Sequence, residues 1–189
     1  LEAERLYRLI AEMPGLALGG LHAYDGHIHE SDSVAREAQC DEALRHVLEL
    51  RARLERIELP IPRLVAGGTP TFAIHARHAD RELSPGTCVL WDFGYGDKFP
   101  DLPFEVAALL LTRVVSKPGG NRLCLDLGHK AVAAENPHPR VRLLELPEAK
   151  AVVHSEEHLV VETPRAHEFR MGQCLHGTPR QTCPTVASE

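Results

Sequence analysis

The chain has 189 residues, of which 43% are hydrophobic and 25% are charged, and its formal net charge is −6. This length suffices for one or two domains with a substantial core. The acidic balance and the lack of a basic run exclude a general nucleic-acid-binding protein, and no apolar stretch is long enough to span a membrane. Five scattered cysteines without a Cys-x-x-Cys pair favour reduced thiols and a cytoplasmic location.

Helical and strand patterns alternate over the first part of the chain. Residues 1–13 have apolar residues at helical spacing, and residues 16–24 are typical of a short buried strand. A second helix is predicted over residues 33–58, where prolines end it, and residues 64–66 begin the next strand. Polar loops follow both strands, as in βα proteins that place their ligands there. This pattern predicts two βα units, too few for a parallel barrel but suited to be the last units of one.

From about residue 83 the pattern changes to short runs separated by Pro, Gly or Asn. None of these runs has helical periodicity beyond one or two turns, so we predict an antiparallel β domain. The chain starts at Leu1 without a Met and ends soon after a motif-like segment, so we expect a fragment truncated at both ends. The predicted strands cover residues 87–92, 107–116, 121–127, 140–146, 151–154 and 158–162.

The loop after the second predicted strand reads Gly-Gly-Thr-Pro-Thr, from Gly67 to Thr71. Glycines at a strand end let backbone N–H groups approach a ligand closely, and a threonine hydroxyl adds a donor. A phosphate is the ligand that suits such a loop best. The alternative is a turn that merely ends the strand.

The loop after the first predicted strand reads Tyr-Asp-Gly-His-Ile-His, from Tyr24 to His29. It combines a phenol, a carboxylate and two imidazoles within six residues. In strand-like geometry His27 and His29 would lie on one face, which is a common spacing of metal ligands. The alternative is a polar surface loop in which Asp25 caps the following turn.

Two further groups of polar residues lie late in the chain. Residues 154–158 read His-Ser-Glu-Glu-His, which lacks the His-Glu-x-x-His order of a zinc protease and predicts a solvated turn between two strands. Residues 177–185 contain a single cysteine, Cys183, between two prolines. Because one soft ligand does not make a metal site, the alternative for this segment is a proline-fixed loop.

Five motifs in this order resemble one protein family, and together they extend from about residue 15 to residue 185. The resemblance is to the metal-activated pyridoxal phosphate enzymes of the D-threonine aldolase / D-serine dehydratase type. It implies the last βα units of a (β/α)8 alanine-racemase-like barrel in residues 1–82, followed by a D-serine dehydratase-like antiparallel β domain in residues 83–189. The motifs are Tyr-Asp-Gly-His at 24–27, Gly-Gly-Thr-Pro-Thr at 67–71, Leu-Asp-Leu-Gly-His-Lys at 125–130, Ser-Glu-Glu-His at 155–158 and Pro-x-x-x-Cys-Pro-Thr at 179–185.

The resemblance implies a lyase that uses pyridoxal phosphate and a divalent metal, Zn or Mn, on D-β-hydroxy amino acids. The implied reaction is retro-aldol cleavage of D-threonine to glycine and acetaldehyde. Alternatives are a D-serine dehydratase, an alanine-racemase-type isomerase, or an inert fragment that serves only for dimerisation. The resemblance further implies a cytoplasmic homodimer that takes a small D-amino acid, with neither nucleic acid nor membrane as a partner.

The same resemblance assigns roles to residues of the two loops. Tyr24, His27 and His29 are expected to line the substrate side of the barrel mouth, and one of the two histidines would move a proton at the β-hydroxyl. Tyr24 is also expected to contact the cofactor. The cofactor phosphate is assigned to Gly67, Gly68 and Thr69.

Two departures from the family pattern matter. The Schiff-base lysine of the family lies on an early barrel strand, which the resemblance places before Leu1, so the fragment alone is expected to be inactive. The histidine position of the metal motif is Gln181, whose neutral oxygen is a weak zinc ligand. Cys183 therefore stays the best metal ligand, and the next candidates are His154, His158 and His176.

Overall fold

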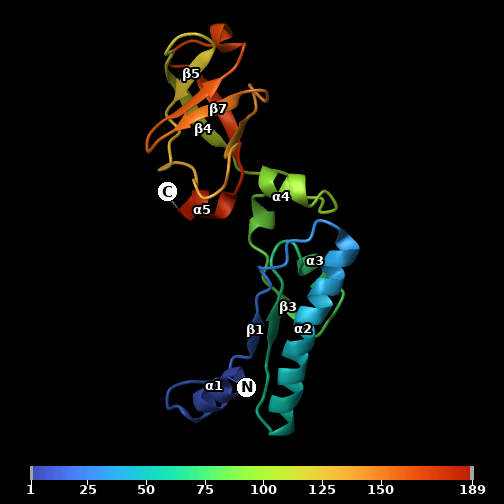
Figure 1. The fold of residues 1–189 in the computed structure, drawn as a ribbon. Helices are drawn as coiled ribbons and strands as arrows, with labels where there is room; N and C mark the ends of the chain where they lie inside the picture. The colour runs from blue at the N-terminus through green and yellow to red at the C-terminus, as the bar shows by residue number, and fades with distance from the viewer. Residues whose placement is uncertain (1, 188–189) are drawn as a thin grey trace. The chain divides into compact units, whose positions relative to one another are not determined.

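A computed structural model describes residues 2–187, and the chain divides into two compact units (Figure 1). The boundary between unit 1 and unit 2 lies between Gly86 and Thr87. Unit 1 contains a three-stranded parallel sheet with helices, and unit 2 contains a six-stranded antiparallel sheet. The predicted α/β-plus-β architecture is therefore confirmed. None of the described helices is long and apolar enough to cross a membrane.

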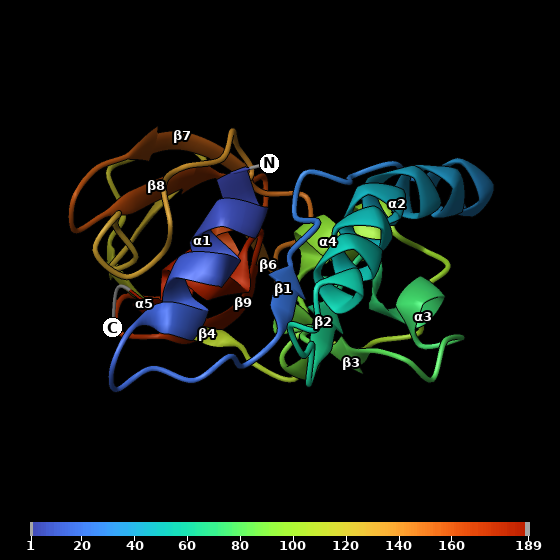
Figure 2. The same ribbon diagram turned by 90° about the horizontal axis from the view of Figure 1, so that it is seen from below.

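Unit 1 alternates helices and strands, as the sequence predicts. β1 and β2 pair in parallel with Ala23 opposite Ala66, and β2 pairs in parallel with β3, which the sequence analysis missed. Figure 2 shows the three strands side by side with α2 beside them. The elements of unit 1 are α1 (Glu2–Glu12), β1 (Leu21–Ala23), α2 (Ser33–Arg56), β2 (Leu64–Ala66), α3 (Phe72–His75) and β3 (Glu82–Leu83).

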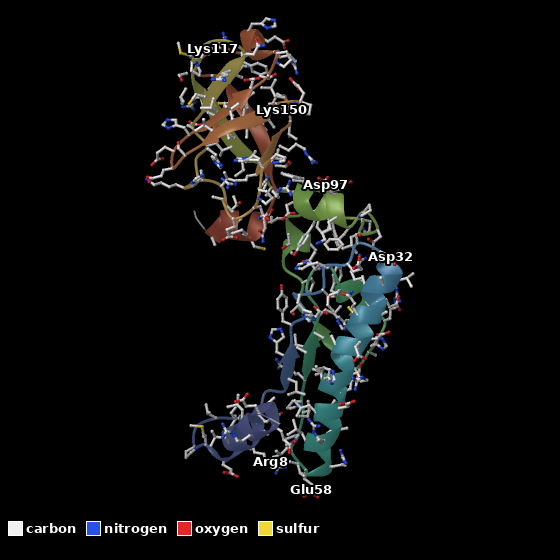
Figure 3. All side chains as sticks on the ribbon, in the orientation of Figure 1. Arg8, Asp32, Glu58, Asp97, Lys117 and Lys150 are labelled. Atoms are coloured by element: carbon white, nitrogen blue, oxygen red, sulfur yellow. The ribbon has the colours of Figure 1, made fainter. Side chains whose placement is uncertain are left out.

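The long helix α2 has clear signals at both ends, which Asp32 and Glu58 mark in Figure 3. The Asp32 side chain accepts a hydrogen bond of 2.8 Å from the backbone N–H of Ala35, which caps the helix N-terminus. At the other end, Glu58 adopts a left-handed φ of 61°, which ends the helical path. Leu54, close to that end, is fully buried. The predicted helix is thus confirmed, with an end two residues earlier than expected.

Unit 2 consists mainly of short strands in the order β6-β9-β4-β5-β8-β7, and all described pairings are antiparallel. Five of the six predicted strands are present. The elements are η1, a 3-10 helix (Thr87–Val89), α4 (Phe93–Lys98), β4 (Leu110–Ser116), β5 (Arg122–Leu125), β6 (Val141–Leu143), β7 (Lys150–His154), β8 (Leu159–Glu162), η2, also a 3-10 helix (Ala166–Glu168), β9 (Cys174–Pro179) and α5 (Thr182–Ala187).

The structure corrects the prediction at the start of unit 2. Residues 87–92, predicted as a strand, contain the short helix η1 instead. The following helix α4 was not predicted, because Gly94 and Gly96 lower its intrinsic helix propensity. Asp92 begins α4 by accepting a hydrogen bond of 2.8 Å from the backbone N–H of Tyr95. A cap and tertiary packing therefore outweigh two poor helix formers here.

A second correction concerns the end of unit 2, where a proline-fixed loop was the alternative. Instead, this segment forms β9, which pairs with β6 on one side and β4 on the other, and the helix α5 follows it. Gly177 is needed within β9, because an added Cβ would lie 2.5 Å from Cγ1 of Val141 on β6. Cys183 therefore lies in the first turn of a helix rather than in a loop.

The sheet of unit 2 is curled, so that its two edge strands come together. Arg140, immediately before β6, is bonded to His154 at the end of β7, although β6 and β7 are the opposite edges of the sheet. The enclosed core includes Val114, Leu123 and Leu175, all fully buried. Because the sheet curls, the side chains on its inner face pack together into one hydrophobic core.

The first and last segments of unit 2 are joined by hydrogen bonds. The buried carboxylate of Asp92 accepts a hydrogen bond of 2.9 Å from the backbone N–H of Thr182, and the Thr182 hydroxyl donates to the carbonyl of Trp91 at 3.0 Å. The N–H of Gly94 donates to the carbonyl of Arg180 at 3.2 Å. Burial raises the pKa of Asp92, and the backbone N–H groups around it oppose that effect.

Candidate functional site

The two predicted loops of unit 1 emerge at the same edge of its sheet. Because β1 and β2 run parallel and in register, Tyr24 after β1 and Gly67 after β2 leave the sheet at neighbouring positions. Ser84, which follows β3, donates its hydroxyl to the carbonyl of Gly67 at 3.0 Å. A Cβ at Gly68 would lie 2.9 Å from Cε2 of Tyr24, so the tyrosine ring packs against this glycine. The carboxyl ends of parallel strands are where α/β proteins place ligands.

Asp25, for which the sequence analysis gave a turn cap as the alternative, is the centre of a buried hydrogen-bond network. Its Oδ1 accepts hydrogen bonds from the N–H of Gly68 at 2.9 Å and from the hydroxyl of Thr71 at 2.7 Å. Its Oδ2 accepts from Nε2 of His75 at 2.9 Å and from the thiol of Cys40 at 3.8 Å. The side chain thus ties the first loop to the glycine loop, to α3 and to α2.

The network keeps Asp25 ionised and fixes the tautomer of His75. Burial alone would raise the pKa of Asp25, but hydrogen bonds from His75, Thr71 and Gly68 hold this pKa below its usual range. The guanidinium of Arg81 lies 3.4 Å from Nδ1 of His75 and can only donate. Nδ1 is therefore the acceptor, and Nε2 carries the proton that is donated to Asp25.

Residues 2–187 contain a group of three possible metal ligands whose ligand atoms all lie within 4.8 Å of one another. The three residues are Asp25, Cys40 and His75. Two observations argue against a metal here. Both ring nitrogens of His75 already have protein partners, since Nε2 bonds to Asp25 and Nδ1 to Arg81. Burial and the charge of Asp25 raise the pKa of the Cys40 thiol to about 12, so the sulfur stays protonated. The group therefore functions as a hydrogen-bond network.

The His-x-His geometry expected for His27 and His29 is not present. Residues 26–27 form a turn, closed by a hydrogen bond of 2.9 Å from the N–H of Ile28 to the carbonyl of Asp25, and both histidines are exposed. His27 lines a pocket of about 270 Å³ together with Tyr24, whereas His29 does not. The structure thus separates the two histidines that the sequence analysis treated alike.

The two histidines are accordingly expected to differ in their effect on turnover. We predict that His27→Ala in the full-length protein slows turnover more than about tenfold, because His27 shares a pocket with Tyr24 and would move the proton of the substrate hydroxyl. His29→Ala is the matched control and is expected to change turnover less than about threefold. Steady-state kinetics of both variants is the measurement. Equal effects of the two substitutions would contradict this assignment.

The glycine loop fits a phosphate in one respect and restricts it in another. Gly67 has a φ of 83°, and an added Cβ at Gly67 or Gly68 would collide with His75 or Tyr24, so the loop requires glycine at both positions. The N–H of Gly68 already donates to Asp25, however, and each amide has one proton. The N–H of Gly68 is therefore already used, and the assignment of a phosphate to Gly67, Gly68 and Thr69 stays a prediction.

The predicted metal position does not fit a metal ion. Oε1 of Gln181 accepts a hydrogen bond of 2.6 Å from Nδ2 of Asn136, and Sγ of Cys183 lies 3.0 Å from the hydroxyl of Thr87. Within the described part of the chain, no group of three possible metal ligands includes Cys183. A neutral amide oxygen and one thiol are a weak donor set for zinc.

A histidine at position 181 is expected to create the missing ligand. We predict that Gln181→His strengthens zinc binding of the full-length protein at least about tenfold, because an imidazole nitrogen then accompanies Cys183 in a His-x-Cys pair. Calorimetric zinc titration of both forms is the measurement. The matched control is Gln173→His, at another Gln of unit 2 and away from Cys183. Equal zinc affinities of Gln181→His and the unchanged protein would place any metal site elsewhere.

Two of the three reserve metal candidates already have other partners. Nδ1 of His176 lies 2.8 Å from the carboxylate of Glu145, and His154 bonds to Arg140. His158 is exposed in the turn between β7 and β8, so the predicted solvated turn is present over residues 155–158, whereas His154 is the half-buried last residue of β7. Sequence reasoning missed Asp25 and His75, although a histidine four residues after Thr71 was a signal that the glycine loop had a buried partner.

Known proteins resemble the chain in sequence and in fold. Residues 107–188 match the family described as "Putative serine dehydratase domain". The chain is 29% identical over 179 residues to a D-threonine aldolase of Arthrobacter sp, an alignment that covers 92% of the chain and 47% of that protein. The structure of D-threonine aldolase from Filomicrobium marinum is 25% identical, with a TM-score of 0.88, over 99% of this chain and 51% of that one.

More distant structures share the fold. D-threo-3-hydroxyaspartate dehydratase from Delftia sp. HT23 is 21% identical with a TM-score of 0.77, covering 93% of this chain and 52% of that one. Alanine racemase from Clostridium difficile 630 is 13% identical with a TM-score of 0.64, covering 93% and 48%. The chain spans about half the length of these relatives. The chain is thus similar to D-threonine aldolases over nearly its whole length, its residues 107–188 match the serine dehydratase domain, and its fold is alanine-racemase-like.

Proposed function

We propose that the full-length protein is a pyridoxal phosphate-dependent lyase that cleaves D-threonine to glycine and acetaldehyde. The observation that carries this proposal is the similarity to two D-threonine aldolases over nearly the whole chain, with the Tyr24 loop and the glycine loop at one edge of the sheet. Two glycines directly after β2 suit the close approach of the phosphate group of such a cofactor.

The bound cofactor would supply an electron sink for the electron pair left on Cα when the Cα–Cβ bond breaks. The chain contributes the groups around it. Gly67 and Thr69 would hold the phosphate, and Asp25 would keep the glycine loop in place through the N–H of Gly68. Tyr24 would pack against the cofactor, and His27 would take the proton from the β-hydroxyl of the substrate.

A dehydratase is the second candidate, because the matching family model and one similar structure carry dehydratase descriptions. In that reaction, the α-proton and the β-hydroxide leave, and D-threonine yields 2-oxobutanoate and ammonia. The same residues would serve both reactions, since each begins with a D-β-hydroxy amino acid held at the barrel mouth. The direction in which His27 moves its proton would then decide the product.

Product analysis of the full-length protein with pyridoxal phosphate distinguishes the candidates. Incubation with D-threonine is expected to release glycine and acetaldehyde in equal amounts, with L-threonine as the control substrate. Formation of 2-oxobutanoate and ammonia would support the dehydratase instead. Racemisation of alanine without cleavage of D-threonine would contradict both and support the isomerase, and no turnover of either amino acid would support the inert alternative. A homodimer stays a prediction, which gel filtration checks.

A further inference from the structure

Arg140 in unit 2 carries a positive charge that no carboxylate neutralises within residues 2–187. Its Nε donates to the carbonyl of Asn136 at 2.7 Å. Its Nη1 donates to Nε2 of His129 at 3.2 Å and to Nδ1 of His154 at 3.1 Å. All three partners are neutral acceptors, although the side chain is half-buried. A partly buried cation without an anionic partner is unusual, because burial favours pairing.

The two histidine rings are oriented so that they accept from Arg140 and add no charge. Nε2 of His154 donates to the carbonyl of Leu127 at 3.0 Å, which leaves Nδ1 as the acceptor. Burial, followed by the charges of His129 and Arg140, lowers the pKa of His154 to about 4. The ring centroids of His129 and His154 lie 4.4 Å apart, edge to face, so the two imidazoles flank one side of the guanidinium.

The remaining donors of Arg140 favour an anion over a metal ion. A guanidinium has five N–H groups, and the three bonds described above use one on Nε and two on Nη1. Two N–H groups on Nη2 are left, and guanidinium donors match carboxylate and phosphate oxygens. A metal ion would have to bind Nε2 of His129 and Nδ1 of His154. Both nitrogens already accept hydrogen bonds from the positively charged guanidinium of Arg140, which would repel a cation.

The nearby carboxylates of Glu156 and Glu157, in the turn after His154, are paired with Lys130. His138 lies beside the cluster, with its ring centroid 5.6 Å from that of His154. Burial lowers the pKa of His138, with smaller contributions from Arg140 and His129, and no carboxylate contributes. The charged groups that shift the pKa values of His138 and His154 are thus Arg140 and neighbouring histidines.

We propose that Arg140, flanked by His129 and His154, binds an oxyanion, which is a carboxylate or a phosphate group, where the edge strands β6 and β7 meet. The Nη2 donors supply the contacts, and the two histidines hold the guanidinium in place from its other side. This site lies within unit 2 and does not depend on the proposed function in unit 1.

Titration of the full-length, ¹⁵N-labelled protein tests the proposal, with inorganic phosphate and sodium acetate as probes and sodium chloride at equal ionic strength as the reference. The ring resonances of His129 and His154 are expected to shift with saturation for at least one probe. Saturation by phosphate alone identifies a phosphate site, and saturation by acetate identifies a carboxylate site. Shifts that grow linearly, or equally with chloride, would overturn the proposal.

Two substitutions locate the binding at Arg140. Arg140→Gln is expected to weaken the affinity for the probe at least about tenfold, because the charged donor is lost. Arg142→Gln is the matched control, since its guanidinium is already paired with Asp97 at 2.7 Å and 3.1 Å, and it is expected to leave the affinity unchanged. If Arg140→Gln fails to fold, Arg140→Lys is the second variant. It keeps the positive charge without the paired N–H donors of the guanidinium, so it should bind the probe more weakly than the unchanged protein. An unchanged affinity in either Arg140 variant would contradict the site.

Discussion

Replacing Asp25 by asparagine is expected to lower the free energy of unfolding of unit 1 by about 3 kcal/mol. Gly68, Thr71, His75 and Cys40 all donate to this buried carboxylate. An asparagine keeps the shape of the side chain but turns one acceptor atom into an NH2 group. That group would face at least one donor, so a buried polar pair would stay unsatisfied. Urea unfolding followed by circular dichroism measures the loss.

Asp32 provides the matched control for this substitution. Asp32 lies in the same unit and accepts a hydrogen bond from the N–H of Ala35, a capping role that asparagine fills equally well. Asp32→Asn is therefore expected to change the free energy of unfolding by less than about 0.5 kcal/mol. A loss in Asp25→Asn no larger than that of the control would mean that the network contributes little.

The stability difference between the unchanged protein and Asp25→Asn is also expected to depend on pH. The folded-state pKa of Asp25 is lowered, so the ionised carboxylate stabilises the folded state above the unfolded-state pKa, which is about 4. This contribution is lost as the pH falls through the lowered folded-state pKa. The difference should therefore be constant from about pH 5 to pH 8 and shrink below about pH 4. A difference that grows in acid would contradict the charge assignment.

Gly68→Val is expected to weaken the affinity for pyridoxal phosphate about hundredfold in the full-length protein. A Cβ at this position would lie 2.9 Å from the ring of Tyr24, and the branched side chain would extend further over the loop. Tyr24 is 67% exposed and has room to move, so the fold is expected to persist. The cofactor phosphate, by contrast, would be kept from the loop backbone by the valine side chain. Cofactor titration by absorbance and an unfolding curve measure the two effects separately.

Gly86→Val is the control for this substitution. Gly86 has no positive φ, and a Cβ added there would have no atom within 4 Å. Its variant is expected to keep the cofactor affinity of the unchanged protein. Undiminished affinity in Gly68→Val would refute the assignment of the glycine loop to the phosphate, whereas equal losses in both variants would indicate a general effect of valine.

The sequence predicted the elements whose local signals agree with their surroundings. A strand beginning with residues 64–66 was predicted, and the observed strand is Leu64–Ala66, because the apolar run stops at two glycines. The helix starting at Ser33 was predicted from its apolar spacing, and the structure adds the Asp32 cap at its start. α4 and β9 were missed, since Gly94 and Gly177 contradict helix and strand propensity and are tolerated only for tertiary reasons.

The site was predicted at the level of loops and missed at the level of contacts. Periodicity and motifs identified the loops that begin at Tyr24 and Gly67, because parallel strands bring such loops to one edge. No local pattern connects Asp25 to His75, which lies fifty residues later and reaches it only after the sheet has formed. The tautomer of His75 depends on Arg81, which likewise follows from the folded geometry alone.

The bonds of Asp92 and Thr182 have a consequence for the way unit 2 opens and folds. They join segments 90 residues apart in the chain, so the last helix gains its partners only when the first segment of the unit is in place. Contacts of such long sequence separation slow folding and make distant segments open together. Amide hydrogens around Gly94 and Thr182 should therefore exchange with solvent in one cooperative event. The first and last turns of this β domain behave as a single folding unit.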